Sequence, residues 1–356
     1  MRCPLILIIG SSLEVSGGIS TVIKNQCAMS GETYRYVHIP TYIQGKFMYQ
    51  IIFFIQAFFK IIVYVLKKKP EIIHIHVSER GSFWRKACII FTLKFYRGKI
   101  VLHHHGAEFI DFFNSLNSLG KILVKKTLLS VSVNFVLGDN LLRIMQKAIT
   151  ARAVYVTVHN GVLPAPRNMY RGSAKGILYM SCFEKRKGIW DLLQVMKELD
   201  PYLDKDIKCY LCGCGKESAG VLSKIRENFL EERIVVLGWI GEREKNRIFQ
   251  DIAIHVLPSY REGMPMSILE TMAYGIPNIA GRAGAVSEII NDKVNGWIFS
   301  PGDTKRLKEL IQFAMENKKV REIISVEAYE TIRTKFSLEQ QQRQFEKYYD
   351  WLLKAV

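Results

Sequence analysis

The chain has 356 residues, of which 49% are hydrophobic, and its 50 lysines and arginines outnumber 33 acidic residues to give a net charge of +17. This length and composition can bury two hydrophobic cores, which excludes a disordered chain or a small disulfide-stapled protein. The seven cysteines are unevenly spaced, and the first apolar run, residues 5–9, is too short for a signal peptide. We therefore expect a protein of the reducing cytoplasm.

The positive charge is concentrated in the first half of the chain. Residues 1–160 hold 20 basic and 7 acidic residues, a net +13, whereas the remainder holds 30 and 26, a net +4. Such a charge suits nucleic acid, anionic lipid or a phosphorylated substrate. The sequence has no zinc finger, aromatic RNA-binding strand motif or clear recognition-helix pattern, so we do not expect a nucleic-acid partner.

Short apolar runs alternate with helical segments in both halves, as is typical of parallel strands joined by helices. Strands are predicted at residues 5–9, 71–77, 99–105 and 132–137, and then at 176–180, 207–212, 233–237, 254–257 and 278–280. Residues 160–175, with two prolines and two glycines, form a plausible linker. The sequence predicts an α/β protein with two doubly wound, Rossmann-like domains.

A glycine pair, Gly17 and Gly18, closes the loop 10–18 that follows the first strand, and a helix is expected to begin near Ile19. Active sites in such sheets gather at the carboxyl ends of the strands. The spacing is not G-x-G-x-x-G, which disfavours a nicotinamide enzyme. A simple turn and a phosphate-binding loop both fit the pair.

Three histidines end the predicted strand 99–105. His103 and His105 share one face of it, His104 lies on the other, and Gly106 would let a ligand come close. These side chains fit either a hydrogen-bonded core or a ligand contact. A metal site is the third alternative, because His74-Ile-His76 offers a second pair on a neighbouring strand, but no carboxylate cluster completes it.

Two further patterns could suggest a metal, and we interpret both otherwise. Asp204 and Asp206 precede the strand 207–212, at its amino end, and are expected to be solvated loop acids. Three cysteines on that strand and its glycine-rich exit have no matching Cys or His pair, so small buried thiols are expected at Cys209, Cys212 and Cys214.

Residues 47–66 are apolar almost throughout and precede three lysines, Lys67, Lys68 and Lys69. A membrane-spanning helix here would place Gln50, Gln56 and Lys60 in lipid. A helix that is partly core and partly membrane-surface element is the better interpretation.

The segment 259–289 carries two carboxylates on different local structures. Pro265 disfavours helix in the residue before it, so Glu262, Gly263 and Met264 are predicted as loop and 267–274 as helix, with Glu270 in its first turns. Free N–H groups between the two acids would suit phosphates, and the carboxylates would accept hydrogen bonds from sugar and ribose hydroxyls.

The glutamate, seven residues, glutamate pattern, with Val-Leu-Pro-Ser at 256–259 before it and Ala-Tyr-Gly-Ile-Pro at 273–277 after it, resembles the donor-binding motif of retaining glycosyltransferases of family 4. The resemblance implies a GT-B fold, in which the two domains face a central cleft. It assigns residues 1–163 to an acceptor-binding domain, 164–335 to a nucleotide-sugar-binding domain and 336–356 to a helix that returns to the first domain.

The same resemblance assigns the site. The HHHGAEF run is similar to the family's sugar-lining histidine segment, and the basic turn 184–188 is similar to its phosphate-binding turn. Glu262 and His105 are implied as catalytic, no metal is implied, and the donor-binding residues are Gly17, Gly18, Lys187, Arg186, Gly263, Met264, Pro265 and Glu270. The chain departs from the family where Ser181-Cys182 replaces the usual Gly-Arg, and Arg186 is the candidate replacement cation.

The implied activity is transfer of a hexose from a nucleotide diphosphate to a lipid-linked saccharide, with retention of configuration, in bacterial surface polysaccharide synthesis. No cofactor beyond the nucleotide-sugar co-substrate is expected. The expected location is the cytoplasm, at the anionic inner face of the plasma membrane. The alternatives are an epimerase or hydrolase of the same fold and, from another class, a non-catalytic nucleic-acid or assembly protein.

Overall fold

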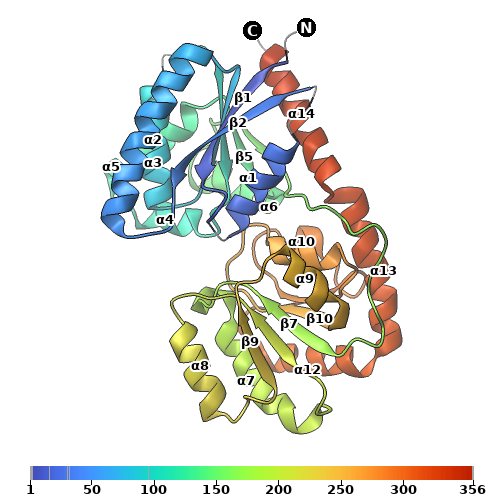
Figure 1. The fold of residues 1–356 in the computed structure, drawn as a ribbon. Coiled ribbons are helices and arrows are strands. Elements are labelled where there is room, and N and C mark those ends of the chain that lie inside the picture. Colours follow the sequence, from blue (N-terminus) through green and yellow to red (C-terminus); the bar gives the residue numbers. More distant parts are fainter. Residues whose placement is uncertain (1–2, 16, 30, 32, 95, 355–356) are drawn as a thin grey trace. The chain divides into compact units, whose positions relative to one another are not determined.

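The computed structural model describes residues 3–15, 17–29, 31, 33–94 and 96–354. The chain folds into two compact units, one formed by residues 1–160 with 338–356 and the other by residues 161–337. Each unit contains a six-stranded parallel sheet flanked by helices (Figure 1), which confirms the predicted α/β class with two doubly wound domains.

The sheet of the first unit has the order β2-β1-β3-β4-β5-β6. Its strands are β1 (Leu5–Ser11), β2 (Arg35–Tyr42), β3 (Ile72–Val77), β4 (Lys99–His104), β5 (Val133–Val136) and β6 (Tyr155–Thr157). Its helices are α1 (Gly18–Ala28), α2 (Phe47–Lys68), α3 (Gly81–Thr92), α4 (Phe109–Ser115), α5 (Ser118–Leu129), α6 (Asp139–Ala148) and α14 (Leu338–Lys354).

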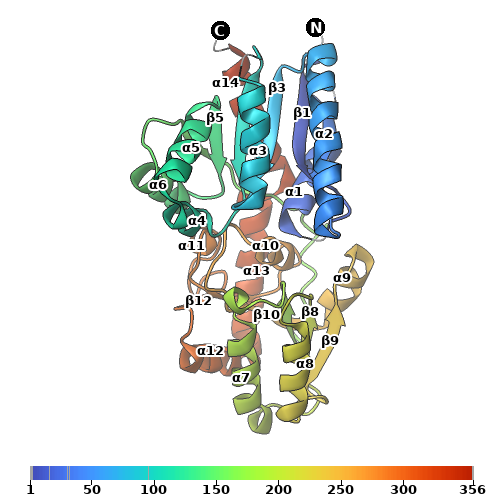
Figure 2. The same ribbon diagram turned by 90° about the vertical axis from the view of Figure 1, so that its left-hand side faces the viewer.

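Side chains alternate between the two faces of this sheet, so each strand contributes to two cores. Ile73 and Ile75 of β3 pack with α2 and α3, which lie along the same face (Figure 2). Ile72 of β3 belongs to the opposite core, where Phe345 and Tyr349 of α14 are fully buried. The carboxyl-terminal helix is therefore part of the first unit.

The second unit has the sheet order β12-β11-β10-β7-β8-β9. Its strands are β7 (Gly176–Met180), β8 (Cys209–Cys212), β9 (Ile234–Gly238), β10 (Ile252–Leu257), β11 (Asn278–Gly281) and β12 (Trp297–Phe299). Its helices are α7 (Ile189–Leu199), α8 (Ser218–Glu227), α9 (Glu242–Ile248), α10 (Met266–Met272), α11 (Val286–Ile289), α12 (Thr304–Glu316) and α13 (Lys318–Lys335), with short 3-10 turns at Lys185–Lys187, Asp200–Tyr202 and Phe249–Asp251.

Strand order reverses between β1 and β3 in the first unit and between β7 and β10 in the second. Helices that follow the two central strands leave on opposite faces, which opens a crevice at the carboxyl ends of those strands. The loops after β1, β3, β7 and β10 are therefore the places where each unit can bind a ligand.

Several element boundaries differ from the sequence-based expectation. Strands β2, β6 and β12 were not predicted; β2 is a partly exposed edge strand with Pro40 in it, and the other two are three residues long. The helix predicted at 267–274 is α10, which ends at Met272. The last two residues of the predicted terminal helix, and Ser16 in the predicted glycine loop, lie outside the described residues.

Candidate functional site

A buried ion pair joins the loops that follow β7 and β10. The ammonium group of Lys187 lies 2.7 Å from Oε1 and 2.8 Å from Oε2 of Glu262, and the two side chains are only 12% and 5% exposed. Burying either charge alone would be costly, so each residue holds the other in place. The structure thus brings together two residues that the sequence assigned to separate tasks.

Glycines in the loops after β7 and β11 allow both loops to pack closely against the loop that carries Glu262. Gly188 has a φ of 69°, and a Cβ placed on it would lie 2.0 Å from the carbonyl oxygen of Pro258. Gly284 has a φ of 54°, and its Cβ would lie 1.9 Å from the carbonyl oxygen of Glu262. Any larger residue would both strain the backbone and push the loop that carries Glu262 out of position.

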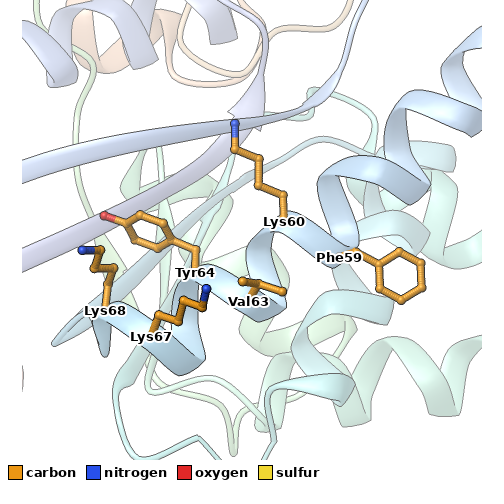
Figure 3. Close-up of a pocket in the computed structure, with 6 residues that line it drawn as sticks. All are labelled: Phe59, Lys60, Val63, Tyr64, Lys67 and Lys68. Carbon is orange, nitrogen blue, oxygen red and sulfur yellow. The ribbon is translucent and has the colours of Figure 1, made fainter.

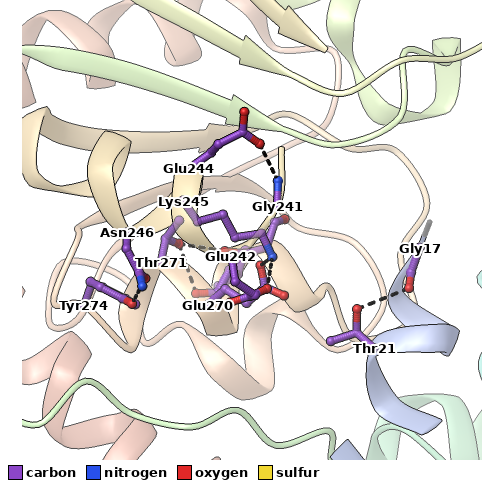
Figure 4. A network of polar contacts seen from close by, with 12 residues as sticks. Gly17, Thr21, Gly241, Glu242, Glu244, Lys245, Asn246, Glu270, Thr271 and Tyr274 are labelled. Carbon is purple, nitrogen blue, oxygen red and sulfur yellow. Dashed lines mark hydrogen bonds and ion pairs between the residues drawn. The ribbon is translucent and has the colours of Figure 1, made fainter. Parts of the chain in front are cut away.

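A second carboxylate is also paired with a lysine. Lys245 of α9 lies 2.8 Å from Glu270 and 3.0 Å from Glu242, and Figure 4 shows its side chain reaching both acids. Burial raises the pKa of Glu270, although Lys245 opposes this shift. Burial would lower the pKa of Lys245, but the charges of Glu270 and Glu242 outweigh it and raise that pKa.

The remaining predicted residues of this unit lie around the first pair. Gly263 accepts a 2.8 Å hydrogen bond from the N–H of Ala285, Met264 is buried, and Pro265 directly precedes α10. As predicted, residues 262–264 are loop and Glu270 is helical.

Arg186 makes a 2.7 Å ion pair with Glu184, and its carbonyl accepts a 2.8 Å hydrogen bond from Tyr260. It lies in the same 3-10 turn as Lys187. Its assignment as a replacement for the missing Gly-Arg stays a prediction.

In the first unit, the predicted glycine loop lies at the reversal of strand order. Gly17 has a φ of 149° and precedes α1, which begins at Gly18, just before the expected Ile19. A Cβ on Gly17 would meet no atom within 4 Å, so its need for glycine is conformational. The role of Gly17 toward a ligand stays a prediction.

His105 directly follows β4, which ends at His104 and not at His105 as predicted. Its N–H still donates to the carbonyl of Val77 at 2.8 Å, and its half-buried ring lies 4.2 Å from that of His103. His104 is on the other face, 3.2 Å from Asn134.

The space beside Gly106 is occupied within the protein. A Cβ there would lie 1.8 Å from the Glu79 carboxylate, so this glycine makes room for Glu79 instead of for a ligand.

Ring nitrogens of His74, His76 and His103 lie within 4.8 Å of one another, the one group among the described residues close enough to hold a metal ion. Both nitrogens of His74 and of His76 already take part in hydrogen bonds, so an ion would have to displace these contacts.

The acidic and cysteine patterns around β8, which could also have suggested a metal, behave largely as expected. Asp206 pairs with Lys175 at the surface, and Cys209 and Cys212 are buried thiols. Cys214 is exposed, which corrects its prediction, because it lies in the loop beyond the end of β8.

Residues 170–331 match the sequence model of the family described as Glycosyl transferases group 1. They belong to that family. The region that matches the family contains Lys187, Glu262, Lys245 and Glu270, so both lysine–glutamate pairs lie inside it.

Curated relatives agree with the family. N-acetyl-alpha-D-glucosaminyl L-malate synthase of Bacillus anthracis is 26% identical over 181 residues, covering 51% of this chain and 46% of the synthase. Lipopolysaccharide 1,6-galactosyltransferase of Escherichia coli K12 is 30% identical over 154 residues, covering 42% of this chain and 41% of that enzyme. The alignments thus span less than half of either relative.

Solved structures extend the likeness to the whole chain. Sucrose-phosphate synthase of Thermosynechococcus elongatus superposes with a TM-score of 0.80 at 17% identity, covering 100% of both chains. HepE of Anabaena in complex with UDP-glucose superposes with a TM-score of 0.74 at 14% identity, covering 98% and 99%. The fold is therefore GT-B, as predicted.

Lys245, Gln26 and Tyr349 were not predicted as parts of these sites. The spacing of Glu242 and Lys245 indicates an ordinary surface pair on a helix, and nothing in it points to Glu270. Gln26 and Tyr349 contact the histidines only through the fold, 48 and 275 residues away from His74 in the chain.

Buried histidines should make the first unit sensitive to acid. Burial lowers the pKa of His38 and His104 to about 4 and keeps those of His74, His76 and His103 well below their usual value. In the unfolded chain these histidines take up protons below about pH 6.5, whereas in the folded unit His38 and His104 stay neutral down to about pH 4 and the other three resist protonation as well. Stability is therefore full at neutral pH and falls through this window, by about 1.4 kcal/mol per pH unit for each histidine that stays neutral only in the folded unit.

Hydrogen exchange at pH 7 and pH 5, corrected for intrinsic rates, should show β3 and β4 losing more protection than β7 and β10, because His255 is the second unit's single histidine. His104→Gln keeps a hydrogen-bonding side chain that does not titrate and should reduce the loss. Equal losses in both units would contradict this account.

Proposed function

We propose that this protein is a metal-independent, retaining glycosyltransferase that moves a hexose from a nucleotide diphosphate to a lipid-linked saccharide in bacterial surface polysaccharide synthesis. The observation that carries the proposal is the Lys187–Glu262 ion pair. It lies where strand order reverses between β7 and β10, within the residues that match Glycosyl transferases group 1. Lipopolysaccharide 1,6-galactosyltransferase among the relatives and UDP-glucose in the HepE complex support the substrate classes.

The geometry suits a diphosphate leaving group. An ammonium group has three N–H donors, and Glu262 accepts from two of them, so Lys187 can donate the third to a phosphate without leaving its partner. Its charge would offset the charge that develops on the departing diphosphate. Glu262, in the loop, would contact the sugar, and Glu270, on α10, the ribose. Within the first unit, Gly17, Gly18 and His105 are the residues that we propose as ligand contacts.

The main test is a titration with a panel of nucleotide sugars, followed by NMR analysis of the product. We expect one nucleotide sugar to bind, transfer to require the saccharide acceptor, EDTA to leave activity intact, and the anomeric configuration to be retained. A product formed equally well without acceptor would favour the epimerase or hydrolase. No binding of any nucleotide sugar would favour a non-catalytic protein, and inversion would contradict the family 4 mechanism.

Substitutions of the two glutamates should affect different quantities, turnover for Glu262 and nucleotide affinity for Glu270. Glu262→Gln keeps the shape of the side chain but removes its charge, so turnover should fall with little change in nucleotide affinity. Glu270→Ala should instead weaken nucleotide binding, measured by calorimetry. Turnover of Glu262→Gln within about threefold of the parent, under about 1 kcal/mol, would refute the assignment.

Helix α2 carries the proposed membrane contact. It is long and apolar enough to cross a membrane, and only 17% of its most apolar 18-residue stretch is buried in the protein. Ala57, Ile61 and Val65 are buried, whereas Phe47, Phe59 and Leu66 are 74%, 62% and 68% exposed. Other exposed apolar residues on it are Met48, Tyr49, Ile51, Ile52, Ile55 and Val63.

Lysines accompany this apolar surface. The six residues that line a hollow on α2 are Phe59, Lys60, Val63, Tyr64, Lys67 and Lys68 (Figure 3). A helix that buries one narrow stripe and exposes apolar and basic side chains together is suited to the interface of an anionic membrane. We propose that α2 holds the enzyme there, where its lipid-linked acceptor would lie.

Replacement of Lys67, Lys68 and Lys69 by Gln should weaken binding to anionic vesicles about 10-fold or more, since each basic residue near such a surface contributes on the order of 1 kcal/mol. Added salt should have the same effect. Sedimentation with vesicles of anionic and of neutral lipid measures both.

The matched control replaces Lys318, Lys319 and Lys335 of α13, three exposed lysines of the other unit, and should leave vesicle binding unchanged. Equal binding to neutral and anionic vesicles, or binding to neither, would rule out the electrostatic contact.

A further inference from the structure

Five buried polar side chains of the first unit form one hydrogen-bonded cluster. Gln26 of α1, His74 and His76 of β3, His103 of β4 and Tyr349 of α14 are each at most 1% exposed. Among the described residues, no carboxylate or lysine donates or accepts a hydrogen bond within it. The imidazoles are neutral, because burial holds the pKa of each well below its usual value. Each ring therefore has one N–H donor and one accepting nitrogen.

The first arm of the cluster determines the tautomer of His105. The amide oxygen of Gln26 can only accept, and it lies 2.8 Å from Nε2 of His76, so His76 carries its proton on Nε2. Nδ1 of His76 must then accept, and it lies 2.8 Å from Nε2 of His105. His105 therefore donates from Nε2, and its Nδ1 keeps the lone pair. Nδ1 takes part in none of the cluster's hydrogen bonds.

The second arm runs away from His105. The amide nitrogen of Gln26 donates to the Tyr349 hydroxyl at 2.8 Å, and that hydroxyl lies 2.5 Å from Nδ1 of His74. The amide nitrogen of Gln26, which can only donate, also lies 3.1 Å from Nδ1 of His74, so this Nδ1 is an acceptor. His74 therefore donates from Nε2 to Nδ1 of His103 at 3.1 Å. Tyr349 thus influences His74 and His103 but lies outside the chain that leads to His105.

We propose that Gln26 and His76 are positioning residues that hold His105 as the neutral Nε2–H tautomer, so that its Nδ1 accepts a hydrogen bond from a hydroxyl of the bound sugar. The role of His105 toward the sugar rests on the proposed function. Its tautomer rests only on the contacts of the first unit. A sugar hydroxyl is a suitable partner because it can donate to a neutral imidazole without any change of charge.

The test measures tautomer and activity separately. In the full-length protein labelled with ¹⁵N-histidine, long-range ¹H–¹⁵N spectra at pH 7 distinguish the two neutral tautomers, and His105→Gln identifies the His105 signals. We expect the Nε2–H form in the parent. Gln26→Met removes the accepting oxygen at similar volume, so His105 should become a mixture of tautomers. Turnover should fall about fivefold to tenfold, the effect of losing one hydrogen bond, while nucleotide affinity stays within twofold.

Tyr349→Phe is the matched control, because it removes one buried hydroxyl of the same cluster and retains the ring that stacks on Phe345. It should change the signals of His74 while His105 stays Nε2–H and turnover stays within twofold. Gln26→Leu gives a second test if Gln26→Met does not fold.

An Nδ1–H or charged His105 in the parent, or an unchanged tautomer in both Gln26 variants, would overturn the proposal. Its failure is distinct from failure of the proposed function. An Nε2–H tautomer that depends on Gln26, in a protein that binds no nucleotide sugar, would uphold the positioning and refute only the reaction. An Nε2–H tautomer with turnover unaffected by Gln26→Met would refute the contact with the sugar.

Discussion

The loops of the second unit depend on one ion pair, because Glu262 can be buried only while Lys187 neutralises it. The pair is possible because strand order reverses between β7 and β10, which places the loops after these strands side by side. Gly188 then lets the loop after β7 approach Pro258, and Gly284 lets the loop after β11 approach Glu262, each to a distance that no residue with a Cβ would permit. A charged pair held in this way is already oriented before a ligand arrives, so little reorganisation remains when a charged group binds to it.

The first unit buries polar groups by a different principle. Its buried histidines His74, His76 and His103 are neutral, and along the arm that runs from Gln26 through His76 to His105 each donating N–H faces an acceptor. Neutral hydrogen bonds avoid the desolvation cost of an ion pair. Each of them also requires a donor on one side and an acceptor on the other, which an interaction between charges does not. The direction is set by the one member that cannot change tautomer, the amide of Gln26. One unit can therefore compensate charge that develops in a reaction, whereas the other can present a fixed pattern of donors and acceptors.

The sequence allowed the fold class and the strands with long apolar runs to be predicted, because central parallel strands are buried on both faces. The sequence did not reveal β2, because its partly exposed residues and Pro40 show neither the alternation of a half-buried strand nor a continuous apolar run. It also did not reveal β6 and β12, which are only three residues long. In the site, spacing placed Glu262 in a loop and Glu270 on a helix. Their lysine partners could not be predicted as partners, because each pair forms across elements that only the sheet order brings together.

Helix α2 presents a conflict between local composition and packing. Its apolar residues would permit a membrane span, yet Ile61 and Val65 are 1% exposed and share a core with Leu7 and Ile9 of β1. Spanning would withdraw these side chains from the sheet and expose β1 and β3 on one face, at a cost of about 1.5–3 kcal/mol for each large residue that loses its burial. Lying in the membrane surface leaves that core intact and covers the side chains that water now contacts. The proposed surface contact is therefore compatible with the role of α2 in the first unit, because the side chains that it would use are not the buried Ala57, Ile61 and Val65.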